Sequence, residues 1–152
     1  MPPAHINLLK NAHWWLEFDQ KLFVHGGFDL KKPLRDQSLQ MLTWDRDLLA
    51  GAWEKHLRGE NFEYPVYQEI FIGHTTTEIY KTTEPLHLGN LWNLDTGAGW
   101  AGKLTIMDIT THQYWQSDLA LELYPSMGRK SIEEYNLKSS KIKPDQFLPT
   151  QC

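Results

Sequence analysis

Apolar and polar positions follow the same order at two places in this chain. Residues 21–24 form a largely apolar run that ends at His25, and residues 70–72 form another that ends just before His74. Short apolar runs bounded by glycine predict buried strands. In both cases glycine lies beside the histidine, so each predicted strand leads into a loop that carries an imidazole at the strand tip.

Further patterns surround the first of these strands. Aromatic and apolar residues at 14–18 predict a strand, and Asp19-Gln20 predicts a two-residue turn that joins it to residues 21–25 as a hairpin. Residues 4–11, preceded by two prolines, predict a short helix. Apolar residues at helical spacing predict one helix over residues 38–58, which Gly59 ends.

The second half of the chain predicts mainly strands and loops. Residues 90–95 favour a strand, and residues 103–109 and 113–116 favour a second hairpin that turns at Thr110 and Thr111. The stretches 60–67 and 75–88 are predicted to be irregular.

Helices that come mostly early and strands that come mostly late indicate an α/β or α+β fold. We expect residues 1–125 to form the folded part and residues 126–152 a polar peripheral or disordered tail.

Composition narrows the class of protein. The chain has 152 residues, a formal net charge of -4 and a single cysteine, Cys152. The sequence has no cluster of basic residues that would predict binding to nucleic acid or to a membrane surface. No apolar run is long enough to span a bilayer. We therefore expect a cytoplasmic protein without an intrachain disulfide. Seven tryptophans are many for this length, and we expect most of them in the core.

The two strand-tip histidines, His25 and His74, are the candidate functional residues. An imidazole can ligate a metal, act as a general base or fill a hydrogen-bonding niche, and the last role is the commonest for a single histidine. Glycines at 26, 27 and 73 remove a side chain and allow a ligand or ion to approach the backbone closely. The residues alone contain no self-sufficient set of metal ligands.

Five segments carry a resemblance to a known family. They occur in the order Phe23-Val24-His25-Gly26-Gly27, Leu42-Thr43-Trp44-Asp45-Arg46, Phe71-Ile72-Gly73-His74-Thr75, Asn93-Leu94-Asp95-Thr96-Gly97-Ala98 and Gly102-Lys103-Leu104-Thr105. As a set they resemble the C-terminal half of the calcineurin-like metallophosphoesterases. The most similar subgroup is the bacterial and phage serine/threonine phosphatases together with the symmetrical diadenosine-tetraphosphate hydrolases.

The resemblance implies roles for particular residues. His25 and His74 would ligate one of two divalent metals, which could be Mn, Fe or Zn. Arg46 would bind the substrate phosphate, for which a guanidinium offers a bidentate fork. Without the resemblance, Arg46 reads as a solvated helix residue paired with Asp45 or Glu54.

Several neighbours would shape the loops around the two histidines rather than ligate a metal. These are Gly26, Gly27, Gly73, Thr75 and Asp95. The implied fold is the C-terminal half of a layered β-sandwich with flanking helices.

The N-terminal motifs of the family, D-x-H, G-D-x-x-D-R-G and G-N-H-[DE], do not occur in the sequence. We therefore expect this chain alone to bind metal weakly and to be inactive. The resemblance implies hydrolysis of a phosphorylated protein, a small phosphomonoester or diadenosine tetraphosphate, with the residues of a separate N-terminal half completing the site.

Two other hypotheses remain open. The chain could be a non-catalytic remnant that binds a partner, such as that N-terminal half. It could also be a carbohydrate-binding module built on Trp14, Trp15, Trp92 and Trp100, although packing of these tryptophans in a core or hairpin is the stronger interpretation.

Overall fold

The computed structural model describes residues 1–125, and the predicted tail at 126–152 lies outside them. The chain divides into two compact units. The first comprises Met1–Thr77 and Glu84–Asp95, and the second comprises Glu78–Thr83 and the residues from Thr96 onward. Each unit is described by itself.

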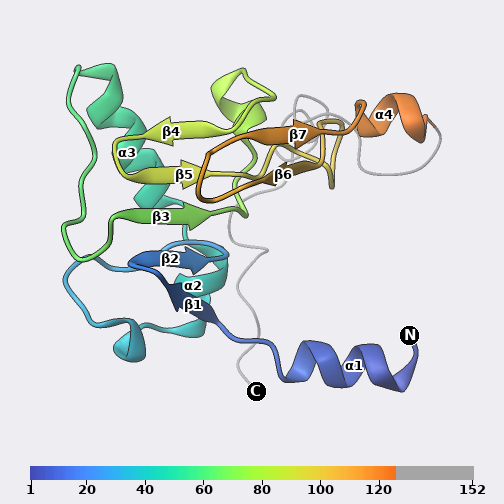
Figure 1. Cartoon of the computed structure of the whole chain (residues 1–152), viewed down its shortest axis with the longest axis horizontal. Helices are drawn as coiled ribbons and strands as arrows, with labels where there is room; N and C mark the ends of the chain where they lie inside the picture. Colours follow the sequence, from blue (N-terminus) through green and yellow to red (C-terminus); the bar gives the residue numbers. More distant parts are fainter. Residues whose placement is uncertain (126–152) are drawn as a thin grey trace, which may run out of the picture. The chain divides into compact units, whose positions relative to one another are not determined.

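The first unit is built on a five-stranded mixed sheet (Figure 1). Its strands, in spatial order, are β1 (Trp15–Phe18), β2 (Lys21–Val24), β3 (Glu69–Ile72), β5 (Leu91–Asn93) and β4 (Leu86–Leu88). The three central strands, β2, β3 and β5, run parallel, whereas the edge strands β1 and β4 run antiparallel to their neighbours. The predicted α/β or α+β class is therefore confirmed.

The first hairpin forms as the sequence predicts. Strands β1 and β2 pair from Trp15↔Val24 to Phe18↔Lys21. The two turn residues, Asp19 and Gln20, have φ values of 49° and 56°. Positive φ at both central positions is typical of the turn that matches the twist of a two-residue hairpin.

The predicted helix over residues 38–58 is wrong as one element, because it is two helices. α2 (Leu39–Trp44) begins after Ser38, whose Oγ accepts a hydrogen bond from Met41 N at 3.1 Å. α3 (Asp47–Leu57) begins after a break, where Asp45 Oδ2 accepts from Leu48 N at 3.0 Å. An aspartate that bonds to first-turn amides starts a new helix, and the regular apolar spacing on both sides conceals this.

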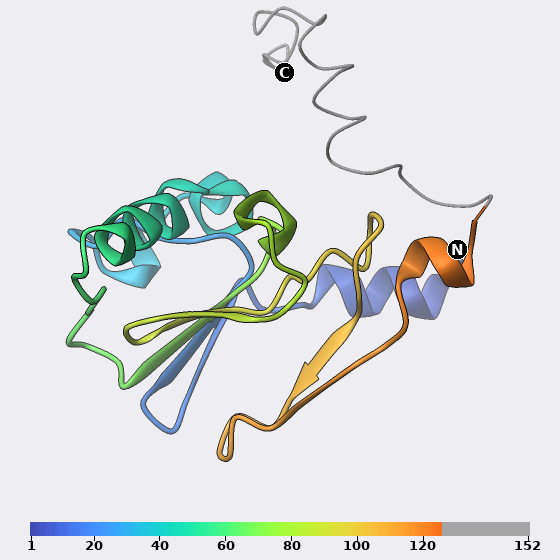
Figure 2. The ribbon, with the colours of Figure 1, turned by 90° about the horizontal axis from the view of Figure 1, so that it is seen from above.

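Both helices lie on the same face of the sheet (Figure 2). The buried side chains between them come from alternate positions of the strands and from one stripe of each helix. They include Leu22, Val24, Ile70, Ile72 and Leu91 from the sheet, and Leu42, Leu48, Leu49 and Ala52 from the helices.

The opposite face of the sheet carries a row of rings. Phe23 stacks on Phe71 with centroids 5.0 Å apart, Phe71 lies 6.5 Å from Trp92, and Trp92 stacks on His87 at 3.9 Å. These residues are paired across neighbouring strands, so they share one face. The sheet is therefore apolar on both faces.

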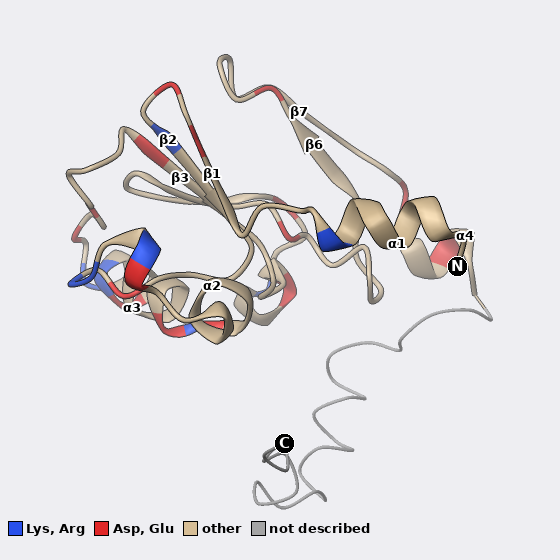
Figure 3. Cartoon of the chain, turned by 90° about the horizontal axis from the view of Figure 1, so that it is seen from below, with Lys and Arg blue, Asp and Glu red and all other residues tan. Residues whose placement is uncertain are grey.

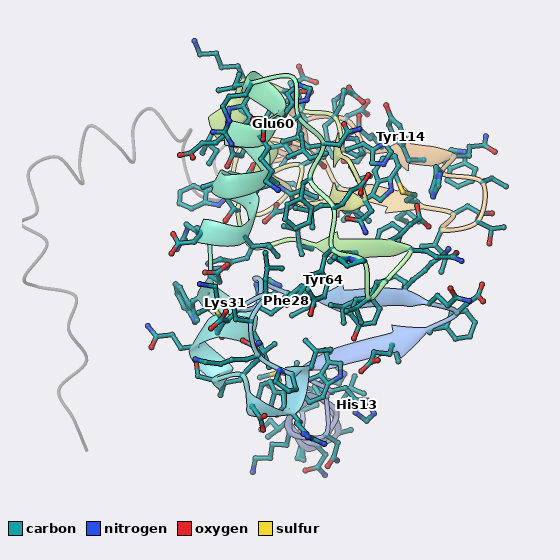
Figure 4. The ribbon with its side chains drawn as sticks, turned by 90° about the vertical axis from the view of Figure 1, so that its left-hand side faces the viewer. His13, Phe28, Lys31, Glu60, Tyr64 and Tyr114 are labelled. Atoms are coloured by element: carbon teal, nitrogen blue, oxygen red, sulfur yellow. The ribbon has the colours of Figure 1, made fainter. Side chains whose placement is uncertain are left out.

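Three other short elements precede β4 in the chain. They are α1 (Pro3–Lys10), none of whose residues is buried, and the 3-10 helices η1 (Leu34–Asp36) and η2 (Thr77–Tyr80). The predicted irregular stretch 60–67 has no helix or strand. Its Tyr64 ring lies edge-on against Phe28 at 5.3 Å (Figure 4). The predicted irregular stretch 75–88 is wrong, because it contains η2 and β4.

The second unit contains the predicted second hairpin. β6 (Thr105–Met107) and β7 (Tyr114–Gln116) pair antiparallel, and the loop between them includes Thr110 and Thr111. Gln116 Nε2 donates to Thr83 O at 2.6 Å, which ties the Glu78–Thr83 segment to this hairpin. α4 (Ala120–Leu123) follows.

The expectation that most tryptophans lie in the core is wrong. Only Trp92 is buried, while Trp14, Trp44 and Trp115 are 53%, 63% and 54% exposed. Each exposed indole lies where covering elements are scarce: before an edge strand, at the end of a short helix, or on a two-stranded sheet. None of the helices in residues 1–125 is long and apolar enough to cross a membrane.

Candidate functional site

The two strand tips meet. β2 and β3 are parallel neighbours with Phe23 opposite Phe71, so His25 and His74 follow the same edge of the sheet. Gly73 N donates to His25 O at 3.0 Å, and the two imidazole centroids lie 5.2 Å apart with an angle of 63° between the rings. The carboxyl ends of adjacent parallel strands are a common place for a binding site.

His74 occupies an unusual backbone conformation. Its φ is 63°, and Thr75 N donates to Gly73 O at 2.6 Å across it, which makes His74 the centre of a γ-turn. A residue with a Cβ at positive φ is strained by roughly 1–3 kcal/mol. The surrounding structure therefore holds this imidazole in place at a cost.

The side chain of His74 is also unusual. Its Nε2 is buried and has no hydrogen-bond partner among the described residues, and the same holds for Oγ1 of the neighbouring Thr75. Burial lowers the pKa of His74 below its ordinary value of 6.5, and the nearby Arg46 and His25 lower it further. The imidazole is therefore neutral at neutral pH, which is the form that ligates a metal. His25, by contrast, is exposed.

The two glycines after His25 make room for protein rather than for a ligand. A Cβ on Gly26 would lie 2.8 Å from Trp44 N, and a Cβ on Gly27 would collide with Asp45 Oδ2. Gly26 N also donates to Leu42 O at 2.7 Å. The sequence predicted that these glycines let a ligand or ion approach the backbone. In the structure, the space beside them is instead filled by the α2–α3 break, which closely approaches the end of β2.

Gly73 differs from these two glycines. A Cβ there would meet His25 O at 3.7 Å and Asp95 Cβ at 3.8 Å, which are ordinary contacts. The positive φ in this loop belongs to His74 instead. Alanine would therefore fit at Gly73 without moving its neighbours.

The α2–α3 break brings Arg46 toward the imidazole pair. Arg46 is the exposed residue before α3, and its Nη1 donates a long hydrogen bond of 3.5 Å to Trp44 O. It forms no ion pair with Asp45 or Glu54 in the part of the chain that the structure describes. Trp44 packs edge-on against His74, with ring centroids 5.0 Å apart.

The end of β5 supports the loop that follows His74. Asp95 O accepts from Thr77 N at 2.8 Å, which places the Asp95 backbone against this loop. Asn93 is fully buried, donates from Nδ2 to Thr75 O at 2.7 Å and accepts from Asp95 N at 3.1 Å. Sequence reasoning missed Asn93, although an amide within an apolar strand is a signal for such a role.

Two cavities that are open to solvent lie in the first unit, and one of them includes His25 in its lining. One, of about 420 Å³, is lined by residues around the α2–α3 break, including Gln40, Trp44 and Arg46. The other, of about 380 Å³, lies at the ends of β2 and β3 and includes His25 and Gly73 in its lining. Both fall in the size range of small-ligand sites.

The charged residues around the two helices are mixed in sign (Figure 3). Arg46 lies between Asp45 and Asp47 in the sequence. Asp45 caps α3 by accepting a hydrogen bond from Leu48 N. The opposing carboxylates Asp45 and Asp95 act to raise the pKa of His74, but less than burial and the cations lower it. The site is thus locally balanced rather than strongly basic.

The donor set limits what the site can hold. In residues 1–125 no three His, Cys, Asp or Glu side chains are grouped so that they could hold a metal ion. Two imidazoles, those of His25 and His74, are fewer donors than the four that a metal coordination sphere needs. The unpaired Nε2 of His74 suits one position of such a sphere.

A comparison with protein-family models finds none that matches the chain, and a search of curated proteins finds no match either.

Proposed function

We propose that this chain supplies part of the active site of a metal-dependent phosphoesterase, with His25 and His74 as metal ligands and Arg46 as a phosphate-binding residue. The observation that carries the proposal is the meeting of the two imidazoles, 5.2 Å apart, at the ends of adjacent parallel strands. The segments that resemble those of calcineurin-like metallophosphoesterases support the same roles.

His74 has the properties of a ligand. Its buried Nε2 has no hydrogen-bond partner among the described residues, and its lowered pKa keeps the ring neutral. An unpaired buried nitrogen costs free energy that a bound metal would return. The strained γ-turn that aims this ring is typical of backbone at functional sites.

Arg46 has the properties of a phosphate-binding group. Its guanidinium is exposed and donates one long hydrogen bond among residues 1–125, and Arg46 precedes α3, where the helix dipole adds positive potential. Its positive charge contributes to the lowered pKa of His74.

The metal would be Mn, Fe or Zn, each of which suits mixed imidazole and carboxylate sites. When bound, it would acidify a water molecule and stabilise charge on the phosphoryl oxygens. Two imidazoles leave most coordination positions to other residues, so we propose that a separate N-terminal half completes the site. The substrate would be a phosphorylated protein, a small phosphomonoester or diadenosine tetraphosphate.

Metal binding tests this proposal directly. Titration calorimetry with Mn²⁺ and with Zn²⁺ should show weak binding to the whole chain, and the signal should disappear in His25→Ala and in His74→Ala. His56→Ala is the matched control, because His56 is an exposed histidine of α3 away from the pair. Binding that survives in both strand-tip variants would refute the assignment.

Hydrolysis gives a second readout. With 4-nitrophenyl phosphate and Mn²⁺, the chain alone should show no turnover above buffer. Turnover that is lost in His25→Ala would show that residues of this chain complete the site without a second half. Turnover that persists in His25→Ala would argue against these metal ligands altogether.

A further inference from the structure

Trp44 is an exposed aromatic residue beside a proposed phosphate-binding group. Trp44 is 63% exposed, although it is the last residue of α2. Exposing an indole forgoes the burial that usually stabilises this residue. An exposed tryptophan next to a binding group is a candidate recognition residue rather than a packing residue.

The indole is held in a defined place. The close approach of Gly26 to Trp44 N leaves no room for a Cβ between them, and Asp45 N donates to Met41 O at 3.3 Å to close the end of α2. The ring itself packs edge-on against His74 at 5.0 Å. One side of Trp44 is therefore fixed by the protein while much of the ring remains open.

The open surface of Trp44 lines the cavity of about 420 Å³ that Arg46 also lines. The same cavity thus offers a planar apolar surface and a guanidinium, and its lining also includes the carboxylates of Asp45 and Asp47. Asp45 Oδ2 accepts a hydrogen bond from Leu48 N. A ligand that uses both features must carry a phosphoryl group and a flat ring within one small molecule.

We propose that Trp44 determines substrate specificity by stacking a planar ring of a phosphate ester whose phosphoryl group binds Arg46. The proposal rests on the function proposed above for Arg46 and deepens it by naming the substrate class: ring-bearing phosphate esters, such as aryl phosphates or nucleotides. Stacking tolerates different rings because each has a π face.

Binding of four probes to the metal-free whole chain tests this, measured by NMR chemical-shift titration. Phenyl phosphate and adenosine 5′-monophosphate carry a planar aromatic ring, whereas methyl phosphate has no ring and ribose 5-phosphate has only a non-planar sugar ring. The probes with a planar ring should bind roughly ten-fold more tightly than their counterparts without one. Preference for adenosine 5′-monophosphate alone would identify a nucleobase, and preference for both would identify any planar ring.

Substitutions assign the effect to Trp44. In Trp44→Ala the ring preference should disappear, and in Trp44→Phe most of it should remain, which separates stacking from a general loss of structure. Trp115→Ala is the matched control, because Trp115 is similarly exposed at 54% but belongs to β7 of the second unit. Equal binding of all probes by the wild type, or a preference that survives in Trp44→Ala, would overturn the proposal.

The same titrations separate this proposal from the function on which it rests. Arg46→Ala should weaken all four probes by a similar factor. If phosphate binding depends on Arg46 but shows no ring preference, only the role of Trp44 fails. If no probe binds, or if Arg46→Ala changes nothing, the phosphate site itself fails and both proposals fall.

Discussion

At the scale of single residues, His74 combines three departures from the ordinary. Its backbone lies at positive φ, its Nε2 is buried and unpaired among the described residues, and its pKa is lowered. The positive φ and the unpaired buried nitrogen oppose stability, and the lowered pKa opposes it only at acidic pH. Their coincidence at one residue, next to His25, is the reason for assigning it a function rather than a packing role.

The strain at His74 gives a prediction about stability. Replacing His74 by glycine should leave the protein about 1 kcal/mol more stable than replacing it by alanine, because glycine adopts positive φ without a Cβ penalty while both changes remove the imidazole. The measurement is the free energy of unfolding from urea titrations of the two variants.

As a control, the free energy of unfolding of Gly73→Ala is compared with that of the wild type. The Cβ at Gly73 has room, so this substitution should change stability little. Should His74→Gly prove no more stable than His74→Ala, the γ-turn would not be strained as described.

At the scale of elements, the break between α2 and α3 organises the site. It places Trp44 and Arg46 on either side of Asp45, and the glycines after His25 let this break pack against the end of β2. In a continuous helix, successive side chains are turned by about 100° about the helix axis, so the positions of Trp44 and Arg46 would be set by that regular rotation alone. The proposed roles of Trp44 and Arg46 therefore depend on this break.

The cap at Asp45 can be tested. Asp45→Ala removes the acceptor for Leu48 N and should lower the free energy of unfolding by about 1 kcal/mol, as the loss of a helix-capping side chain usually does. Asp45→Asn keeps a capping oxygen and should cost much less. Urea titration of both variants makes the measurement.

Glu54→Ala is the control for the loss of an acidic residue, because Glu54 is an exposed residue in the interior of α3. A cost for Asp45→Ala no larger than that for Glu54→Ala would mean that the cap does not hold the break.

At the scale of the whole molecule, the first unit exposes apolar surface at its edge. Leu16 and Phe18 of the edge strand β1 are 54% and 61% exposed. An exposed apolar edge strand favours pairing with another chain. This observation supports the alternative hypothesis that the chain binds a partner, such as a separate N-terminal half.

Self-association tests the exposed edge. The isolated chain should elute from size-exclusion chromatography at a volume that falls as concentration rises, and Phe18→Lys should reduce this shift. Leu57→Lys is the matched control, since Leu57 is 69% exposed at the end of α3 rather than on the sheet edge. A wild-type chain that stays monomeric and melts cooperatively at all concentrations would instead indicate an independent domain.

Local features were predictable from the sequence. The two hairpins, the strand-tip positions of His25 and His74 and the end of a helix near Gly59 depend on neighbouring residues, whose periodicity and turn chemistry are visible in a single sequence. Strand β4 was missed because a three-residue strand has no periodicity to detect. The exposed tryptophans were missed because burial depends on which elements cover them.

By itself, then, the sequence determined that two apolar strands end in histidine-bearing loops and that Trp44, Asp45 and Arg46 follow one another. Only the tertiary structure decided that β2 and β3 are parallel neighbours, that the two imidazoles lie 5.2 Å apart and that Gly26 and Gly27 receive the α2–α3 break. The physical reason is that strand order and side-chain burial arise from contacts between residues distant in the chain, which local patterns do not specify.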